Sequence, residues 1–223
     1  MTEPHAQAYA ELRTRVTQLV GQVDPADLDR PAPATPGWRA RDVLAHLVGV
    51  SDDIVSDRRD GIASDEWTEA QVDRRRDIPL AELLADWKRW GPGFEALLAA
   101  GPAELTGQAL FDAATHEHDL RQAVARPGAR ASAAMQQGWD WFVEARTRMG
   151  APAVRFVTER SDDVAGVGDP CITVRAPYFE LFRATTGRRT AAEMEGYDWD
   201  PAPDVEIILA APFFTIRTES LDE

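Results

Sequence analysis

Two residues of the segment FDAATHEHDLRQAV (111–124), Asp112 and His116, have the spacing of a pair of metal ligands on one helix. Residues four apart lie on the same helical face, about 5–6 Å apart at their Cβ atoms, so this carboxylate and this imidazole can bind a single ion. A second imidazole, His46, lies in the apolar segment ARDVLAHLVGV (40–50) and is expected to point into a helical bundle. A carboxylate with two imidazoles leaves positions open for water or substrate. This donor set is typical of a catalytic zinc site or of a related divalent metal site.

Each part of this pattern also has a purely structural interpretation. A single histidine on an apolar helix face is more often a core residue with one hydrogen bond, and acid–imidazole pairs four residues apart are common on helix surfaces. Asp119 is three residues after His116 and is the best candidate to accept a hydrogen bond from the imidazole nitrogen that faces away from a metal. His118 points about 200° away from His116 around a helix. We expect it to be exposed or to contact another part of the protein.

The first 150 residues have the periodicity of helices. Apolar residues recur three and four positions apart, and Pro and Gly separate the periodic segments. The expected helices cover residues 6–22, 39–60, 65–77, 79–100, 109–126 and 132–149. The segment 65–77 is polar, which predicts a short surface helix. Antiparallel helices with modest connections indicate a helical bundle.

The pattern changes near Gly150. Residues 153–158 and 172–175 alternate in the manner of strands, and the Asp- and Gly-rich segment 161–170 predicts a loop. A helix is expected from Pro177, with Gly187 at its C-terminal end. Residues 205–209 and 213–216 are further strand candidates. The sequence therefore predicts an α+β protein with a helical domain over 1–150 and a small α+β domain over 151–223.

The charge of the chain disfavours nucleic-acid binding. There are 24 basic and 38 acidic side chains, which gives a formal net charge of −14. A protein that neutralises phosphates should carry a basic surface, and repulsion from DNA is expected here instead. The single lysine, Lys88, among many arginines indicates a GC-rich coding genome.

Cysteine content and hydropathy indicate the compartment. The single cysteine, Cys171, cannot form an internal disulfide, and we expect it to be packed in the core rather than to act as a nucleophile. No apolar run approaches the roughly 18 residues of a membrane span, and no signal peptide is visible. The sequence therefore predicts a cytoplasmic protein, either a monomer or a homodimer.

Three arginines, Arg183, Arg188 and Arg189, surround the end of the helix that starts at Pro177. The guanidinium fork suits carboxylates, so one of them could reach the metal cleft and bind an acidic thiol or a substrate carboxylate. A solvated helix end, favoured by the helix dipole, explains them equally well.

Three segments together resemble the mycothiol-dependent maleylpyruvate isomerase family: TPGWRARDVLAHLVGV (35–50), FDAATHEHDLRQAVARPG (111–128) and APYFELFRATTGRR (176–189). The resemblance spans nearly the whole chain. It implies a DinB-like up-and-down four-helix bundle with extra helices, followed by a small domain of the sterol-carrier type, with His46, Asp112 and His116 as metal ligands. Better-known members carry glutamate at the acidic position, so Asp112 is a departure. The GC-rich composition agrees with an actinobacterial source, where mycothiol is the resident thiol.

The resemblance implies an enzyme. A divalent metal, with zinc as first choice, is expected to lower the pKa of the mycothiol thiol, and the thiolate then adds to a small electrophile such as maleylpyruvate. Departure of the thiol gives cis–trans isomerisation, whereas retention gives an S-conjugate, so an isomerase and an S-transferase both remain open. The alternative is a non-enzymatic module that binds a small lipid-like ligand, with structural histidines.

Overall fold

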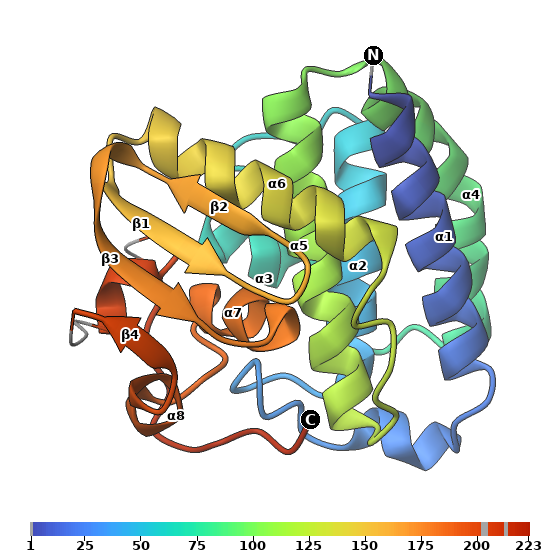
Figure 1. The fold of residues 1–223 in the computed structure, drawn as a ribbon. Coiled ribbons are helices and arrows are strands. Elements are labelled where there is room, and N and C mark those ends of the chain that lie inside the picture. Colours follow the sequence, from blue (N-terminus) through green and yellow to red (C-terminus); the bar gives the residue numbers. More distant parts are fainter. Residues whose placement is uncertain (1, 202–204, 212–213) are drawn as a thin grey trace.

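The computed structural model describes residues 2–201, 205–211 and 214–223, and Figure 1 shows their fold. The helical part comprises α1 (Glu3–Val20), the 3-10 helix η1 (Pro25–Asp29), α2 (Ala40–Val55), α3 (Asp65–Asp73), α4 (Leu80–Ala100), α5 (Ala103–Ala123) and α6 (Ala133–Arg148). Helices α4 and α5 each pack against both α1 and α2, and these four helices form the expected bundle. Helix α6 lies along α5, and α3 packs on α2.

Local chemistry sets the ends of these helices. Helix α2 begins where the Asp42 carboxylate accepts a hydrogen bond from the backbone N–H of Arg39, at 2.9 Å. It ends at Val55 instead of continuing to residue 60, because Asp57 adopts a left-handed backbone conformation with φ of 59°. Helix α5 begins directly after Pro102, six residues before its predicted start. Its first turns expose Leu105, so they lack the apolar periodicity that marks a buried helix face.

The second part of the chain is a small sheet with short helices. Strands β1 (Pro152–Val157), β2 (Asp162–Ala165), β3 (Val167–Arg175) and β4 (Asp198–Asp200) follow the order β2-β1-β3-β4. Strand β1 is antiparallel to β2 and parallel to β3, and β4 is antiparallel to β3. The remaining elements are α7 (Tyr178–Thr185), α8 (Ala191–Glu195) and the 3-10 helix η2 (Val205–Ile208).

Three predictions for this part need correction. The supposed loop 161–170 holds β2 and the start of β3, joined at Gly166 with φ of 124°; burial along β2 is confined to Ala165, so no apolar alternation marked it. Residues 205–209, expected as a strand, contain η2, which buries Ile208; a short apolar run fits either a strand or a buried helical turn, and periodicity alone does not separate the two. Of the strand expected over 213–216, residue 213 lies outside the described residues and 214–216 form no strand.

One apolar cluster joins the two parts. Trp139 of α6 packs against Phe156 of β1 and Tyr178 of α7, with ring centroids 5.5 and 5.4 Å away. Phe182 of α7 contacts Phe111 of α5 at 5.4 Å, so α7 lies between the sheet and the bundle. The α+β class is confirmed, whereas a division into domains at residues 150–151 stays a prediction. Among the described helices, none combines the length and apolarity needed to cross a bilayer.

Candidate metal centre

The three predicted ligands come from two helices that pack together in the bundle. His46 projects from α2, and Asp112 and His116 project one turn apart from α5. His46 is 2% exposed, because it lies on the face of α2 that carries the buried residues of that helix. Side-chain exposure is 12% for His116 and 38% for Asp112, so the cluster is closed on the side of α2 and opens toward solvent at the carboxylate.

The distances within the cluster fit a divalent metal. His46 Nε2 lies 3.4 Å from one Asp112 oxygen, and His116 Nε2 lies 3.5 Å from the other. One donor atom from each of the three residues lies within 4.8 Å of the others. Tetrahedral ligands about 2.1 Å from a metal are themselves about 3.4 Å apart, so both carboxylate–imidazole distances match coordination of one ion. The short side chain of Asp112 therefore reaches both imidazoles.

An unpartnered nitrogen supports the same interpretation. His46 Nε2 is buried and has no hydrogen-bond partner, although buried polar atoms almost always have one. Burial raises the pKa of Asp112, but His46 and then His116 lower it more, and the pKa ends below its ordinary value. A negative carboxylate between two imidazole nitrogens, one of them without a partner, is a donor set that zinc and related divalent metals accept.

Contacts behind the two imidazoles hold the rings. His46 Nδ1 lies 2.8 Å from Oε1 of Gln71, a residue of α3. The sequence did not point to Gln71, because α3 has too little apolar periodicity to indicate a buried face; it was expected on the surface, yet Gln71 and Val72 are fully buried. Trp38 lies beside both imidazoles, with ring centroids 5.5 Å from His46 and 6.0 Å from His116.

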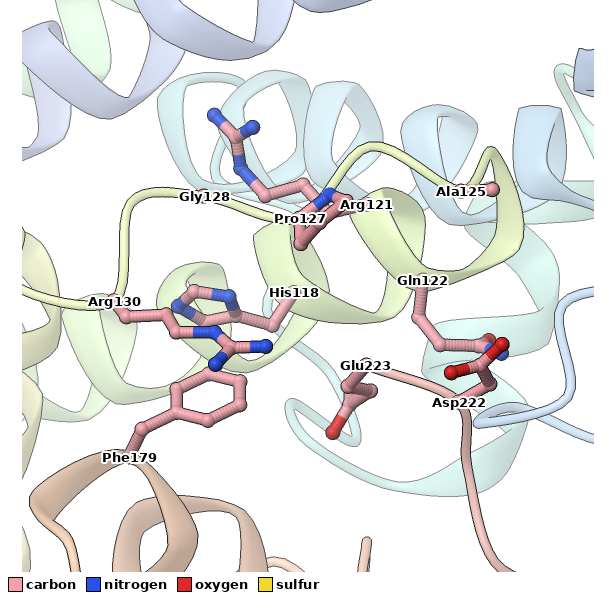
Figure 2. A pocket seen from close by; sticks show the side chains of 10 residues that line it. All are labelled: His118, Arg121, Gln122, Ala125, Pro127, Gly128, Arg130, Phe179, Asp222 and Glu223. Carbon is pink, nitrogen blue, oxygen red and sulfur yellow. The ribbon is translucent and has the colours of Figure 1, made fainter.

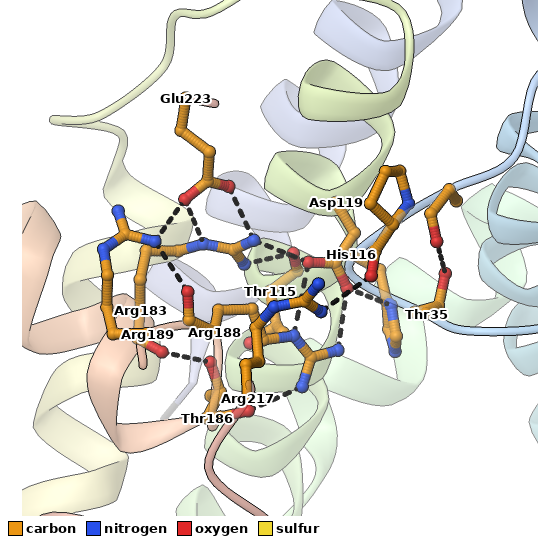
Figure 3. Close-up of polar contacts among 12 residues, drawn as sticks. Thr35, Thr115, His116, Asp119, Arg183, Thr186, Arg188, Arg189, Arg217 and Glu223 are labelled. Carbon is orange, nitrogen blue, oxygen red and sulfur yellow. Dashed lines mark hydrogen bonds and ion pairs between the residues drawn. The ribbon is translucent and has the colours of Figure 1, made fainter. Parts of the chain in front are cut away.

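Asp119 lies behind His116, as expected from its spacing. Its Oδ2 is 3.0 Å from His116 Nδ1, on the nitrogen that faces away from Asp112 (Figure 3). The carboxylate is fully buried and paired with Arg183 at 2.7 Å and Arg188 at 2.8 Å. Burial raises the pKa of Asp119, but the charges of Arg188 and Arg183 outweigh it, and the pKa lies well below its ordinary value.

The three arginines of the second part differ in their surroundings. Arg183 is completely buried, where it also donates to the backbone carbonyl of Thr115 and to the Glu223 carboxylate. Arg188 retains 11% side-chain exposure and reaches both oxygens of Asp119. Arg189 pairs with Glu180 and Glu223 and does not reach the cluster (Figure 3). Their predicted role in binding a thiol or a carboxylate stays a prediction.

Two other residues lie apart from the cluster. His118 is buried edge-on against Phe179 of α7 at 4.9 Å, which is the contact with another part of the protein that its position predicts. Burial and the nearby Arg183 hold the pKa of His118 well below its ordinary value. The prediction that Cys171 is packed in the core is wrong: it is exposed on β3, where the residues from Val167 to Cys171 face solvent.

A hollow of about 310 Å³ opens beside His118, between α5 and α7 (Figure 2). The guanidinium of Arg130 stacks on Phe179 at 4.4 Å along this hollow. The rest of the wall combines the side chains of Arg121, Gln122, Asp222 and Glu223 with the less polar segment that contains Ala125, Pro127 and Gly128.

Fold and site together define an α+β protein with an open histidine–aspartate cluster in a helical bundle. Residues 9–110 match the family model of the mycothiol maleylpyruvate isomerase N-terminal domain. A crystal structure of a point mutant of the mycothiol-dependent maleylpyruvate isomerase is similar over 91% of this chain and 94% of that chain, with a TM-score of 0.63 and 11% identity. A second crystal structure of that isomerase, with the same identity and coverage, has a TM-score of 0.56. Comparison with curated proteins gives no match.

These findings confirm the resemblance to the mycothiol-dependent maleylpyruvate isomerase family. The sequence match covers the segment from Tyr9 to Leu110, which contains His46. Asp112 and His116 follow shortly after it, so the assignment of these two candidate ligands on α5 rests on the geometry described above. The structural likeness extends the shared fold over the sheet and the C-terminal helices.

Proposed function

We propose that the protein is a metal-dependent, mycothiol-using enzyme that acts on a small electrophile such as maleylpyruvate, as an isomerase or as an S-transferase. The observation that carries this proposal is the convergence of His46, Asp112 and His116 at coordination distances in a bundle whose N-terminal domain matches this family. A divalent metal, with zinc as first choice, would be held by these three residues and would supply the Lewis acidity that lowers the pKa of the thiol.

The residues around the cluster have separable tasks in this proposal. Asp112 supplies negative charge at the open side, and the buried Asp119 orients His116 through its Nδ1 nitrogen. Trp38 covers the rings of His46 and His116 and limits the access of water. Arg188, the arginine that is both near His116 and partly exposed, is our candidate for holding a carboxylate of the thiol or the electrophile. Arg183 and Arg189, whose guanidinium groups are buried in ion pairs, hold Asp119 and the C-terminal segment in place.

The two reactions share their first half. Sulfur adds to one carbon of the cis double bond, which becomes a single bond that can rotate. Expulsion of the same thiol restores the double bond in the trans form and regenerates mycothiol. If the adduct instead takes up a proton and is released, the thiol is consumed and the product is an S-conjugate.

The test compares metal content and turnover in the wild-type protein and in His116→Ala. We expect the wild-type protein, purified without a tag, to hold about one equivalent of zinc. It should also convert an electrophile in the presence of mycothiol, with thiol loss separating S-transfer from isomerisation. A protein free of metal and inactive toward the whole panel of electrophiles would favour the alternative, a small-ligand binding module. We also propose that the protein is cytoplasmic, because an enzyme that uses mycothiol must be located where this intracellular thiol is present.

A further inference from the structure

His46 is connected to a chain of buried polar groups that leads away from the metal cluster. Its Nδ1 lies 2.8 Å from Gln71 Oε1, and Gln71 Nε2 donates to Asp53 Oδ2 at 3.1 Å. His46, Gln71 and Asp53 are at most 2% exposed. Solvent therefore does not compete for these groups, and each hydrogen bond constrains the next.

The far end of this chain determines the direction of every hydrogen bond in it. Asp53 also accepts from Arg58 and from Arg74, at 2.7 and 2.6 Å, and a carboxylate paired with two guanidinium groups can only accept. The nitrogen of the Gln71 amide must therefore face Asp53, which leaves its oxygen to face His46. An oxygen in that place requires a proton on His46 Nδ1, because two acceptors would otherwise meet.

Close packing of α3 on α2 holds the Gln71 side chain in this place. Gly49 lies one turn after His46 on α2, and a Cβ atom at this position would come within 2.6 Å of Gln71 Cβ and 2.9 Å of its Cγ. Any larger residue at position 49 would push Gln71 outward. The glycine thus admits the side chain that reaches His46 from the neighbouring helix.

From this arrangement we infer that Gln71 is a positioning residue: it fixes His46 in the Nδ1–H tautomer and so presents the lone pair of Nε2 to the metal cluster. The buried Nε2 has no hydrogen-bond partner and faces Asp112. This is the arrangement expected of an imidazole nitrogen that binds a metal ion. The part of the inference that concerns the metal rests on the function proposed above. The tautomer itself does not, because the hydrogen-bond chain that sets it contains no metal.

The test uses Gln71→Met and Gln71→Glu, with two readouts. The first is the ¹⁵N spectrum of the His46 imidazole in the metal-free protein, which distinguishes the two tautomers. The second is the affinity for Zn²⁺ alone, measured by competition with a chelating dye. Methionine keeps the size of the side chain but removes the acceptor, so we expect the Nδ1–H tautomer to lose its dominance and Zn²⁺ affinity to fall by about 10–100-fold.

Glutamate restores an oxygen opposite Nδ1, and in its protonated form it also donates to Asp53 from its second oxygen, as the amide does. Gln71→Glu should therefore keep the Nδ1–H tautomer and bind Zn²⁺ more tightly than Gln71→Met, a rescue that a merely space-filling role would not produce. Gln136→Met, at a solvent-facing glutamine of α6 bonded to Asp140, serves as the matched control and should leave both readouts unchanged. Circular dichroism confirms that each variant is folded.

Two results would overturn the inference. One is a wild-type His46 protonated on Nε2. The other is a folded Gln71→Met with wild-type tautomer and Zn²⁺ affinity. If Gln71→Met does not fold, Asp53→Asn replaces it: the amide at position 53 can donate as well as accept, so Gln71 can turn over and the tautomers should mix. If the wild-type protein binds Zn²⁺ no better than His46→Ala, the proposed function fails, and the tautomer spectrum alone decides the role of Gln71.

Discussion

The carboxylate of Asp119 and the imidazole of His116 face each other at 3.0 Å, on the side of the ring opposite Asp112. Asp119 also pairs with Arg183 and Arg188, which belong to the second part of the chain. A single buried carboxylate thus contacts both a predicted metal ligand and the ion pairs that join the bundle to α7.

We expect Asp119→Asn to lower the free energy of unfolding by about 3 kcal/mol at pH 7, because it leaves the buried Arg183 with only Glu223 as counter-charge. Urea unfolding measures the effect, with Asp60→Asn on an exposed loop as the control. The native pKa of Asp119 lies well below the ordinary value of 3.8, so its stabilising effect is complete above that value. The effect is then lost as the pH falls through the native pKa. A difference between the two variants that grew on acidification would contradict this assignment.

His116→Ala should lose the bound metal and the activity while keeping the fold, because the core is built from apolar side chains such as Leu44 and Trp87. His118→Ala provides the matched control: it removes an imidazole two residues away that faces Phe179 and not the cluster. Metal analysis of both purified variants checks the expectation. Equal zinc content in the two would exclude His116 as a ligand.

The role of Asp112 as a metal ligand can be tested by changing the charge and the length of its side chain. Asp112→Asn keeps the size of the side chain but removes its charge, and we expect Zn²⁺ affinity to fall about tenfold or more. Asp112→Glu supplies the acid found in better-known members of the family and should retain more affinity than the asparagine variant. Because the aspartate already reaches both imidazoles, tighter binding by glutamate is not expected. Titration with a chelating dye measures all three proteins.

Two glycines with the same backbone conformation should respond differently to alanine. Gly187 and Gly150 have φ of 71° and 70°, and a Cβ atom at position 150 would meet no atom within 4 Å. A Cβ atom at position 187 would come within 2.3 Å of the Thr215 carbonyl oxygen. We expect Gly150→Ala to cost about 1 kcal/mol of stability from backbone strain alone, and Gly187→Ala to cost clearly more. Equal midpoints in urea would show that the segment around Thr215 moves aside freely.

The sequence predicts those elements of the fold in which buried apolar residues recur at the regular spacing of a helix or a strand. The bundle helices, β1 and the helix after Pro177 all appear in the expected order and places, with the largest errors at the end of α2 and at the start of α5. Strand β2 was missed because its residues are mostly polar and exposed.

The candidate site was predictable to the extent that it depends on spacing along one helix. Asp112, His116 and Asp119 lie within two turns of α5, so their proximity follows from helical geometry. His46 could be added because its helix is plainly apolar. Gln71 could not be predicted, because its contact with His46 depends on the packing of α3 against α2 at Gly49. The polar sequence of α3 contains no pattern that indicates this packing.

The buried carboxylate of Asp119 also restricts how this protein can be recombined. Apart from His116, its partners are two arginines from beyond residue 151, so a chimera that kept the bundle and replaced the rest would strand a negative charge in the interior. A chimera that folds must supply other basic side chains next to Asp119, or must also replace Asp119 by a neutral residue. The two parts of the chain are therefore not interchangeable modules, and a substitution that alters one of them constrains what the other can become.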